Sequence, residues 1–483
     1  MKILVVGGSI AGMGTALALS GPGREIIVLD RDSAPPDVEM NQVFDAWQRK
    51  GATQLRHGHG FTARFLNILR DRYPDLLTAL MKAGARTATF EDTLAPSVRE
   101  RYRSEPGDGE IRILLSRRTT LEFVMRDYVA KRPGVTFITD TRGSNIITEK
   151  SPGGIVAAKG MVIQKGDSAP EEMRADIIVD ASGRNSIFRD RLAEQGVEPV
   201  VEEKPVGIVY FTRHYQFRSG RQMAWTPDTA GVRFDYFSLG VIPGDENNFV
   251  VMAMIPINEK VLRARIMHAD VFDRVCATFP GVSEWTSHAD ATSQVLGMGD
   301  LKNVWVHWVK DGRPLIKDFF TIGDAAIRTN PAFGRGCSFA FIEAELLADA
   351  LRESDDPIVR AKLYESKVEA TMRPYFDQMV RQDEMIIRNA RNAKDPAYRP
   401  SLAAKLIKSF ADNAVGPAMH SDIVVRRAIM RGGQMLDPPT AWMKNPAVLA
   451  RLLAIWAKPK HNKFYPPSAD LGYDGLMTLV GST

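Results

Sequence analysis

The sequence has very little cysteine: Cys276 and Cys337 are the only two in a chain of 483 residues. They lie far apart and have no partners at the spacings that metal sites use. The sequence therefore supports neither a disulfide framework nor a zinc site, and no bound metal is expected. So few thiols favour a reducing compartment, and the expected location is the cytoplasm.

Long apolar runs are also lacking, since none approaches the ~20 residues that span a bilayer. The first residues, MKILVV, enter a glycine turn at once and leave no room for a secretory signal. The sequence therefore predicts no transmembrane segment. Residues 448–460 (VLARLLAIWAKPK) are apolar over much of a helix and basic at its end, which suits either a peripheral membrane contact or, preferably, packing on a core.

A strong excess of one charge is absent as well. The 63 Lys and Arg residues exceed the 58 Asp and Glu residues by five and are spread along the chain. This balance does not indicate nucleic acid as a partner, although it is compatible with a basic entrance to a site for an anionic substrate. With 44% hydrophobic and 25% charged residues, the chain reads as a globular protein of two or three domains.

The first thirty residues have the pattern of a βαβ unit. A β-branched run (2–6) enters the turn GGSIAG and a helix-forming stretch, and a second strand (25–30) follows. The turn matches the dinucleotide fingerprint G-x-G-x-x-G, except that serine replaces the middle glycine. The site residues that this pattern predicts are Gly7, Gly8, Ser9, Gly12, Asp30 and Arg31.

Physical chemistry explains this choice of residues. Backbone N–H groups at the turn and the positive field of the helix N-terminus would bind a pyrophosphate. Gly7 permits the tight turn, Gly12 lets helix and strand pack closely, and the Asp30 carboxylate can accept both hydroxyls of a ribose. The fingerprint predicts a dinucleotide site without distinguishing FAD from NAD(P).

A second glycine-marked turn, GDAAIRTNPAFGRG, occupies residues 323–336. It follows a strand and opens a helix whose apolar positions have helical spacing. Here the sequence resembles the flavoprotein monooxygenase superfamily, which includes aromatic hydroxylases, squalene epoxidases, flavin-dependent halogenases and geranylgeranyl reductases. In that superfamily, GD followed by PxxGxG is the second FAD signature.

The resemblance implies FAD as the cofactor. Asp324 would bind the ribityl chain, Pro331 would lie near the ring, and the helix N-terminus would stabilise the anion of reduced flavin. Gly334 and Gly336 would offer their N–H groups to the pyrimidine end of the ring. The residues carried over to the site from this signature are Gly323, Asp324, Pro331, Gly334, Arg335 and Gly336.

Two further segments extend the resemblance over roughly residues 1–355. Arg118, in SRRTTLE, sits where the family places an arginine against FAD, and Arg117 fills that position equally well. Residues 175–192 match the middle signature through Asp180 and Gly183, but the usual Asp-Gly reads Ser182-Gly183. Because that aspartate also serves the reduced nicotinamide, NAD(P)H as electron donor is expected to act either directly or through a separate flavin reductase.

The expected fold class is α/β. A discontinuous Rossmann-like FAD-binding domain (1–200 and 300–355) would carry an inserted antiparallel-sheet substrate domain (201–299) and a helical C-terminal region (356–483). The insert begins with aromatic, alternating runs that predict antiparallel strands. Its predicted substrate residues are Phe211, Arg213, Tyr215, Phe234 and Tyr236, with packing in the core as the alternative.

Two histidines, His57 and His59 in QLRHGHGF, are the candidate catalytic residues, because imidazoles near a flavin could tune protonation or hold substrate. The alternative is that they are loop histidines with ordinary hydrogen bonds. As a metal pair they lack a third ligand nearby.

The expected activity is that of an FAD-dependent monooxygenase. It would use O₂ to hydroxylate or epoxidise an apolar aromatic or olefinic small molecule through a flavin C4a-hydroperoxide. The alternatives are an FAD-dependent reductase or dehydrogenase of an unsaturated substrate and, with less support, a halogenase, because the W-x-W-x-I-P motif is absent. A flavoprotein that only binds or senses ligands is the non-enzymatic alternative.

Overall fold

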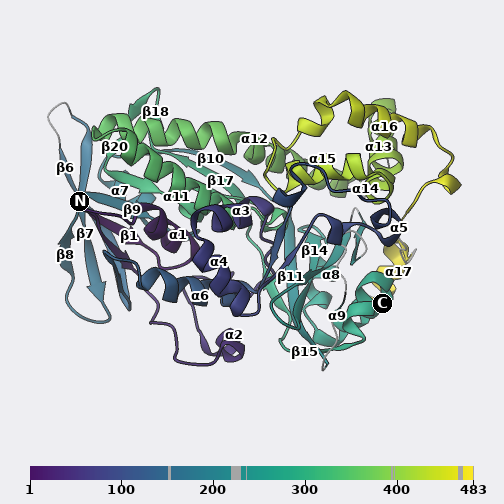
Figure 1. Ribbon diagram of the computed structural model, residues 1–483, viewed down its shortest axis with the longest axis horizontal. Helices are drawn as coiled ribbons and strands as arrows, with labels where there is room; N and C mark the ends of the chain where they lie inside the picture. Colours follow the sequence, from purple (N-terminus) through teal and green to yellow (C-terminus); the bar gives the residue numbers. More distant parts are fainter. Residues whose placement is uncertain are drawn as a thin grey trace.

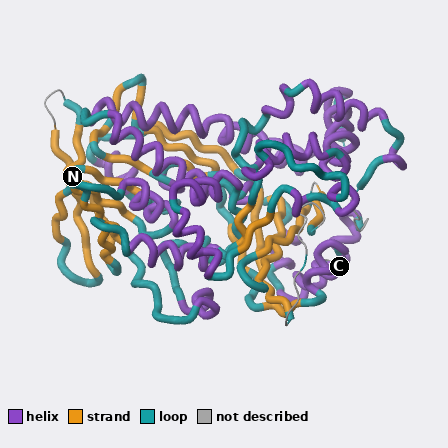
Figure 2. Tube along the Cα trace, viewed as in Figure 1, coloured by secondary structure: helices purple, strands orange, loops and turns teal. Residues whose placement is uncertain are grey.

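The computed structural model describes residues 1–150, 154–218, 223, 230–234, 236–392, 395, 397–465 and 471–481. The molecule is elongated. The parallel sheet lies at one end, and the antiparallel sheet and the C-terminal helices lie at the other (Figures 1 and 2).

The first layer is a five-stranded parallel sheet of strand order β21-β9-β1-β2-β5. Its β1 and β2 are the two strands that the opening pattern predicts. Strands β5, β9 and β21 come from parts of the sequence far from β1 and β2, so long-range contacts hold the sheet together. Its strands are β1 (Lys2–Val6), β2 (Glu25–Leu29), β5 (Val135–Ile138), β9 (Ile177–Asp180) and β21 (Phe319–Thr321).

Alternate residues of β1 face two different layers, as the period of a strand requires. Ile3 and Val5 pack against helices, whereas Leu4 and Val6 pack against a second sheet. The helices are α1 (Ile10–Leu19), α3 (Ala63–Arg72), α4 (Pro74–Lys82), α6 (Arg118–Ala130) and α11 (Gly336–Glu353). The second sheet contains β6 (Thr141–Lys150), β7 (Val156–Lys165), β8 (Glu171–Arg174) and β20 (Ile316–Lys317), with α7 (Phe188–Glu194) beside it.

The inserted segment forms a six-stranded antiparallel sheet, as its alternating runs predict. Three helices cover one face, and together with residues 471–480 near the C-terminus they form a separate apolar core with it. The strands are β11 (Ile208–Phe217), β12 (Gly231–Phe234), β13 (Phe237–Pro243), β14 (Asn248–Pro256), β15 (Ala289–Ala291) and β16 (Leu296–Met298). The helices are α8 (Lys260–Ile266), α9 (Ala269–Thr278) and α10 (Pro280–Thr286).

The chain enters and leaves this segment along two paired strands, β10 (Val200–Pro205) and β17 (Lys302–His307), which are antiparallel. The short β22 (Ile327–Arg328) completes their sheet. Shorter elements elsewhere are α2 (Val43–Ala46), β3 (Arg86–Ala88), α5 (Pro96–Arg99), β4 (Ile113–Leu115), β18 (Val309–Lys310) and β19 (Arg313–Pro314).

The C-terminal region begins with the long α12 (Pro357–Asn392) and continues into a small helical bundle (Figure 1). The bundle contains α13 (Leu402–Phe410), α14 (Gly416–Ser421), α15 (Ile423–Gly433) and α16 (Pro446–Ala457); α17 (Gly472–Leu479) follows. Among the described residues, none of the helices combines the length and apolar character needed to cross a bilayer.

Candidate functional site

A cavity of about 380 Å³ lies where β1, β9 and β21 end. Its size is in the range of small-molecule sites, and the carboxyl edge of a parallel sheet is where such folds bind ligands. Segments that are far apart in the sequence line it, from residues 7–11 through 181–185 to 323–340. The two glycine turns therefore meet at one site.

The first turn is shaped by close backbone contacts. Gly7 has φ +109°, and a Cβ there would lie 2.4 Å from the Ala181 carbonyl oxygen. A Cβ on Gly12 would lie 1.7 Å from the Gly7 carbonyl oxygen, so any larger residue would push α1 off the sheet. Gly12 therefore allows α1 to pack closely against the turn, although it does not itself line the cavity.

The N-terminus of α1 has no side-chain cap. Ser9 occupies the capping position, but its hydroxyl donates to Glu122 Oε1 (2.7 Å) and accepts from Arg118 Nη2 (3.1 Å). The first N–H groups of α1 are therefore left for a ligand. A helix N-terminus of this kind favours an anion.

The second turn opens α11 in the same way. Gly334 has φ +64° and packs against the Gly60 carbonyl, and Arg335, which precedes the helix, gives it no side-chain cap. A Cβ on Gly336 would meet nothing within 4 Å, although Gly336 lines the cavity. The start of α11 thus faces open space.

A buried polar group holds the second turn in place. Asn330 accepts from the Ala332 N–H (3.0 Å) and donates to Asp383 Oδ1 (2.6 Å), a residue of α12. Asn303 donates to the other carboxylate oxygen of Asp383 (2.7 Å). Burial raises the pKa of Asp383 to about 6. The C-terminal region thus positions the turn before α11.

The cavity end near β2 contains a buried charge cluster that the sequence did not indicate. Arg49 contacts Asp30 Oδ2 (3.0 Å), Asp32 Oδ2 (3.0 Å) and Glu122 Oε2 (3.5 Å). Burial raises the pKa of Asp30 although Arg49 opposes it. Asp30 lines the cavity, but Arg49 already holds one of its carboxylate oxygens.

Arg118 and His59 form the opposite wall. Arg118 donates to Glu122 Oε1 (2.7 Å) and to His59 Nε2 (2.9 Å), and the His59 Nδ1–H donates to the His57 carbonyl (2.9 Å). Burial and the Arg118 charge hold the pKa of His59 well below its usual range, so this imidazole is neutral. Of the two arginines that the sequence left open, Arg118 lines the cavity, whereas Arg117 pairs with Asp245 (2.8 Å).

No family model matches this sequence, and no curated protein is detectably similar to it. Solved structures do match. PqsL, a probable FAD-dependent monooxygenase from Pseudomonas aeruginosa, is 15% identical, with a TM-score of 0.58 over 81% of this chain and 98% of that chain. The chain has the flavoprotein monooxygenase fold.

Two other enzymes of known structure share this fold. The p-nitrophenol 4-monooxygenase PnpA from Pseudomonas putida DLL-E4 is 16% identical, with a TM-score of 0.59 over 90% of this chain and 98% of that chain. The flavin-dependent brominase Bmp2 is 15% identical, with a TM-score of 0.57 over 84% of this chain and 93% of that chain. The resemblance that the two glycine turns predicted is confirmed at the level of the fold.

Most of the predicted cofactor residues lie together in this fold. Among the predicted cofactor and catalytic residues, four do not line the cavity: Gly12, Asp180, Arg335 and the candidate catalytic His57. Asp180 instead accepts from Ser182 and Ser186, and Arg335 lies over the rings of Phe333 and Tyr375. The predicted residues that do line it are Gly7, Gly8, Ser9, Asp30, Arg31, His59, Arg118, Gly183, Gly323, Asp324, Pro331, Gly334 and Gly336.

The predicted substrate residues lie away from the cavity. Phe211 and Tyr215 belong to the core between the antiparallel sheet and its helices, and Phe234 and Tyr236 pack against that core. The Arg213 guanidinium donates to the Ala269 carbonyl (2.9 Å). None of these five lines the cavity. Nearly every residue of β11 is buried, so alternation alone could not identify the face that meets the site.

The opposite face of β11 contributes Tyr210 to the cavity. Its hydroxyl donates to the sulfur of Met298 (2.6 Å), which also lines the cavity. Burial raises the pKa of Tyr210 above its usual range. Together these two side chains form a mostly apolar wall with one polar atom.

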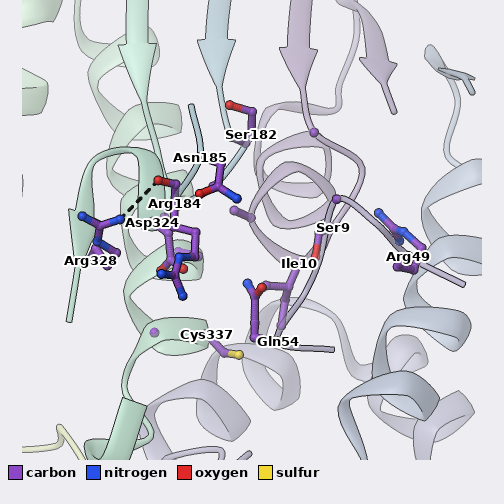
Figure 3. A pocket seen from close by; sticks show the side chains of 18 of the residues that line it. Ser9, Ile10, Arg49, Gln54, Ser182, Arg184, Asn185, Asp324, Arg328 and Cys337 are labelled. Atoms are coloured by element: carbon purple, nitrogen blue, oxygen red, sulfur yellow. Dashed lines mark hydrogen bonds between the residues drawn. The ribbon is translucent and has the colours of Figure 1, made fainter. Parts of the chain in front are cut away.

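Two arginines that the sequence did not single out lie on the wall opposite Ser9 and Arg49 (Figure 3). Arg328 donates to the Arg184 carbonyl (3.2 Å), and both lie near Asp324. Burial raises the pKa of Asp324 although both arginines and Arg118 oppose it. Arg184 directly follows Gly183 in the sequence, so its place in the middle signature is the signal that could have indicated it as a site residue.

The pKa of the buried His214 makes the stability depend on pH. Its Nε2 lies 2.7 Å from the Arg56 carbonyl oxygen, and burial lowers its pKa to about 4. Since an unfolded histidine titrates near pH 6.5, the folded chain binds fewer protons between pH 6.5 and 4, and stability is lost as the pH falls through that range. Between pH 7 and pH 5, wild type is expected to lose about 2 kcal/mol more of its unfolding free energy than His214→Gln loses.

Urea unfolding at pH 7, 6 and 5 measures this difference between wild type and His214→Gln. His268→Gln, at an exposed histidine, is the matched control and should leave the pH dependence of wild type unchanged. Parallel pH dependence of wild type and His214→Gln would contradict the assignment.

Proposed function

We propose that this protein is an FAD-dependent monooxygenase that hydroxylates or epoxidises an apolar aromatic or olefinic small molecule. One observation carries the proposal: α1 and α11 both begin, without side-chain caps, at the same cavity. Two such helix ends suit a ligand with a diphosphate at one end and a ring that gains negative charge at the other.

The residues present fit FAD. The N–H groups of Gly8 and Ser9 would hold the diphosphate at α1, and Asp30 with Arg31 would hold the adenosine end. Gly334 and Gly336 would place the ring against the start of α11, where a Cβ on Gly336 meets only open space. Asp324 would bind the chain between the two ends.

When bound and reduced, FAD supplies the activation of O₂. The chain's own residues would do the rest. The α11 N-terminus and Arg118 would stabilise negative charge on the ring, and the neutral His59 would hold Arg118 in place. Tyr210 and Met298 would form the apolar wall that orients substrate and excludes water.

The reaction balances with NAD(P)H as the donor of two electrons. One atom of O₂ enters the substrate, the other leaves as water, NAD(P)H is oxidised to NAD(P)⁺, and one proton is taken up from solvent. The Ser182-Gly183 sequence leaves two routes for these electrons, direct reduction by NAD(P)H or a separate flavin reductase.

Reconstitution with FAD followed by anaerobic stopped-flow reduction tests the proposal. NADH and NADPH would each be mixed with the holoprotein, with and without a panel of apolar phenols and alkenes. Product formed under ¹⁸O₂ should contain the label. Failure to bind FAD would overturn the proposal, and an unlabelled product formed without O₂ would replace it with a reductase.

A further inference from the structure

The C-terminal bundle has an apolar surface that the other described residues of the chain do not cover. None of the side chains of α13 is buried, yet four of them are large and apolar, and three of these four are exposed. Leu402 is 79% exposed, Leu406 58% and Ile407 69%. Their spacing places them on one side of the helix, so they form one apolar stripe.

A second helix extends this surface. The rings of Phe410, at the end of α13, and Trp456, at the end of α16, meet edge to face at 5.3 Å. Leu406 lies one turn before Phe410, and Leu453, 55% exposed, lies one turn before Trp456. We call Leu402, Leu406, Ile407 and Leu453 the α13–α16 face.

Basic residues adjoin the α13–α16 face. The segment KPKHNK (458–463) follows α16 directly, and Lys463 donates to the Trp456 carbonyl (2.9 Å). The exposed Tyr465 lies two residues after Lys463, and its hydroxyl donates to Asn413 Oδ1 (3.0 Å), which ties the segment to the helical turn that directly follows α13. Lysines and a tyrosine beside exposed leucines are typical of a membrane–water interface.

The net charge of the C-terminal bundle is strongly positive. Residues 397–465 contain eleven Lys and Arg residues, three Asp residues and no Glu residue. All three aspartates are paired, Asp412 with Lys408, Asp422 with Arg451 and Asp437 with Arg431. The prediction that the charge is spread along the chain is therefore wrong, because this bundle carries more than the net +5 of the protein.

We propose that the α13–α16 face docks on the surface of a membrane that contains anionic phospholipid. The leucines would enter the boundary between headgroups and acyl chains, and the lysines of residues 458–463 would meet the headgroups. A second copy of this chain is a poor occupant, because a two-fold contact would press two strongly basic bundles together. The proposal does not depend on the proposed monooxygenase activity.

Vesicle flotation of the full chain tests this docking. The vesicles would contain phosphatidylcholine with about 30 mol% phosphatidylserine, and phosphatidylcholine alone would be the comparison. Binding should be at least about tenfold stronger to the anionic vesicles and should weaken by a similar factor at about 0.5 M salt. Equal binding to both vesicles, or none to either, would overturn the proposal.

Two variants separate the apolar from the charged contribution. Leu402→Ser with Leu406→Ser and Ile407→Ser, all at exposed positions, should reduce binding by about tenfold or more. Lys458→Glu with Lys460→Glu should remove the preference for anionic vesicles. The matched control is Ile257→Ser with Val261→Ser, at positions that are each 51% exposed on the antiparallel-sheet domain, and it should bind as wild type does.

Two measurements distinguish membrane docking from unfolding and from self-association. Thermal unfolding of each variant should match wild type, because no substituted side chain is buried. Analytical ultracentrifugation should show the same mass for wild type and the leucine variant. A dimer that the leucine variant abolishes would overturn the proposal in favour of self-association. Because vesicle flotation needs no bound flavin, it reports on docking even if the protein fails to bind FAD.

Discussion

Gly336→Val is expected to abolish FAD binding and leave the fold intact. The residue opens α11, its φ is not in the left-handed region, and an added Cβ meets no atom within 4 Å. The valine methyls would therefore fill the space in front of the α11 N-terminus, where the proposed flavin ring would lie. We expect the Kd for FAD to rise by about 100-fold or more, equivalent to roughly 3 kcal/mol.

Fluorescence quenching during titration with FAD measures this Kd, and circular dichroism with thermal unfolding of the apoprotein measures the fold. The matched control is Gly433→Val, at an exposed glycine near the end of α15 that also has free space and no positive φ. It should bind FAD as wild type does. Normal affinity in Gly336→Val would contradict the placement of the ring at α11.

The sequence predicted the two turns because the backbone geometry there depends on glycine. Gly7, Gly323 and Gly334 all have positive φ, and Gly12 cannot carry a Cβ. Such requirements leave a pattern at fixed spacing in the sequence. The resemblance in fold could therefore be inferred before the turns were seen to share one cavity.

The rest of the site could not be predicted, because tertiary contacts decide it. Arg49 lies in an irregular segment without periodicity, and its role depends on three carboxylates from separate elements. The sequence left open whether Phe211 and Tyr215 line the site or pack in the core, because both faces of β11 are buried, one by helices and one by the site region. Asp383 acts from α12, more than fifty residues beyond Asn330.

Arg49→Met is expected to cost about 3–5 kcal/mol of unfolding free energy at pH 7. The Arg49 side chain is only 2% exposed and holds Asp30, Asp32 and Glu122 together. Methionine fills similar space without charge, so three buried carboxylates would lose the cation they share, leaving Arg118 beside Glu122 and Arg126 near Asp30. Removing one member of a buried charge cluster leaves its partners uncompensated.

The pH dependence of this loss separates charge from packing. Burial raises the pKa of Asp30, and the Arg49 charge opposes that rise. Without Arg49 the folded variant would therefore bind more protons at Asp30 than the unfolded chain does, and its stability would increase as the pH falls. Urea unfolding at pH 7 and 5 should therefore show that the variant's loss of unfolding free energy is smaller at pH 5.

Arg174→Met is the matched control, because Arg174 also has two carboxylate partners, Glu149 and Glu172, but is 57% exposed. It should cost less than about 1 kcal/mol. A deficit in Arg49→Met that is equal at both pH values would mean that lost packing, not uncompensated charge, is what destabilises the variant.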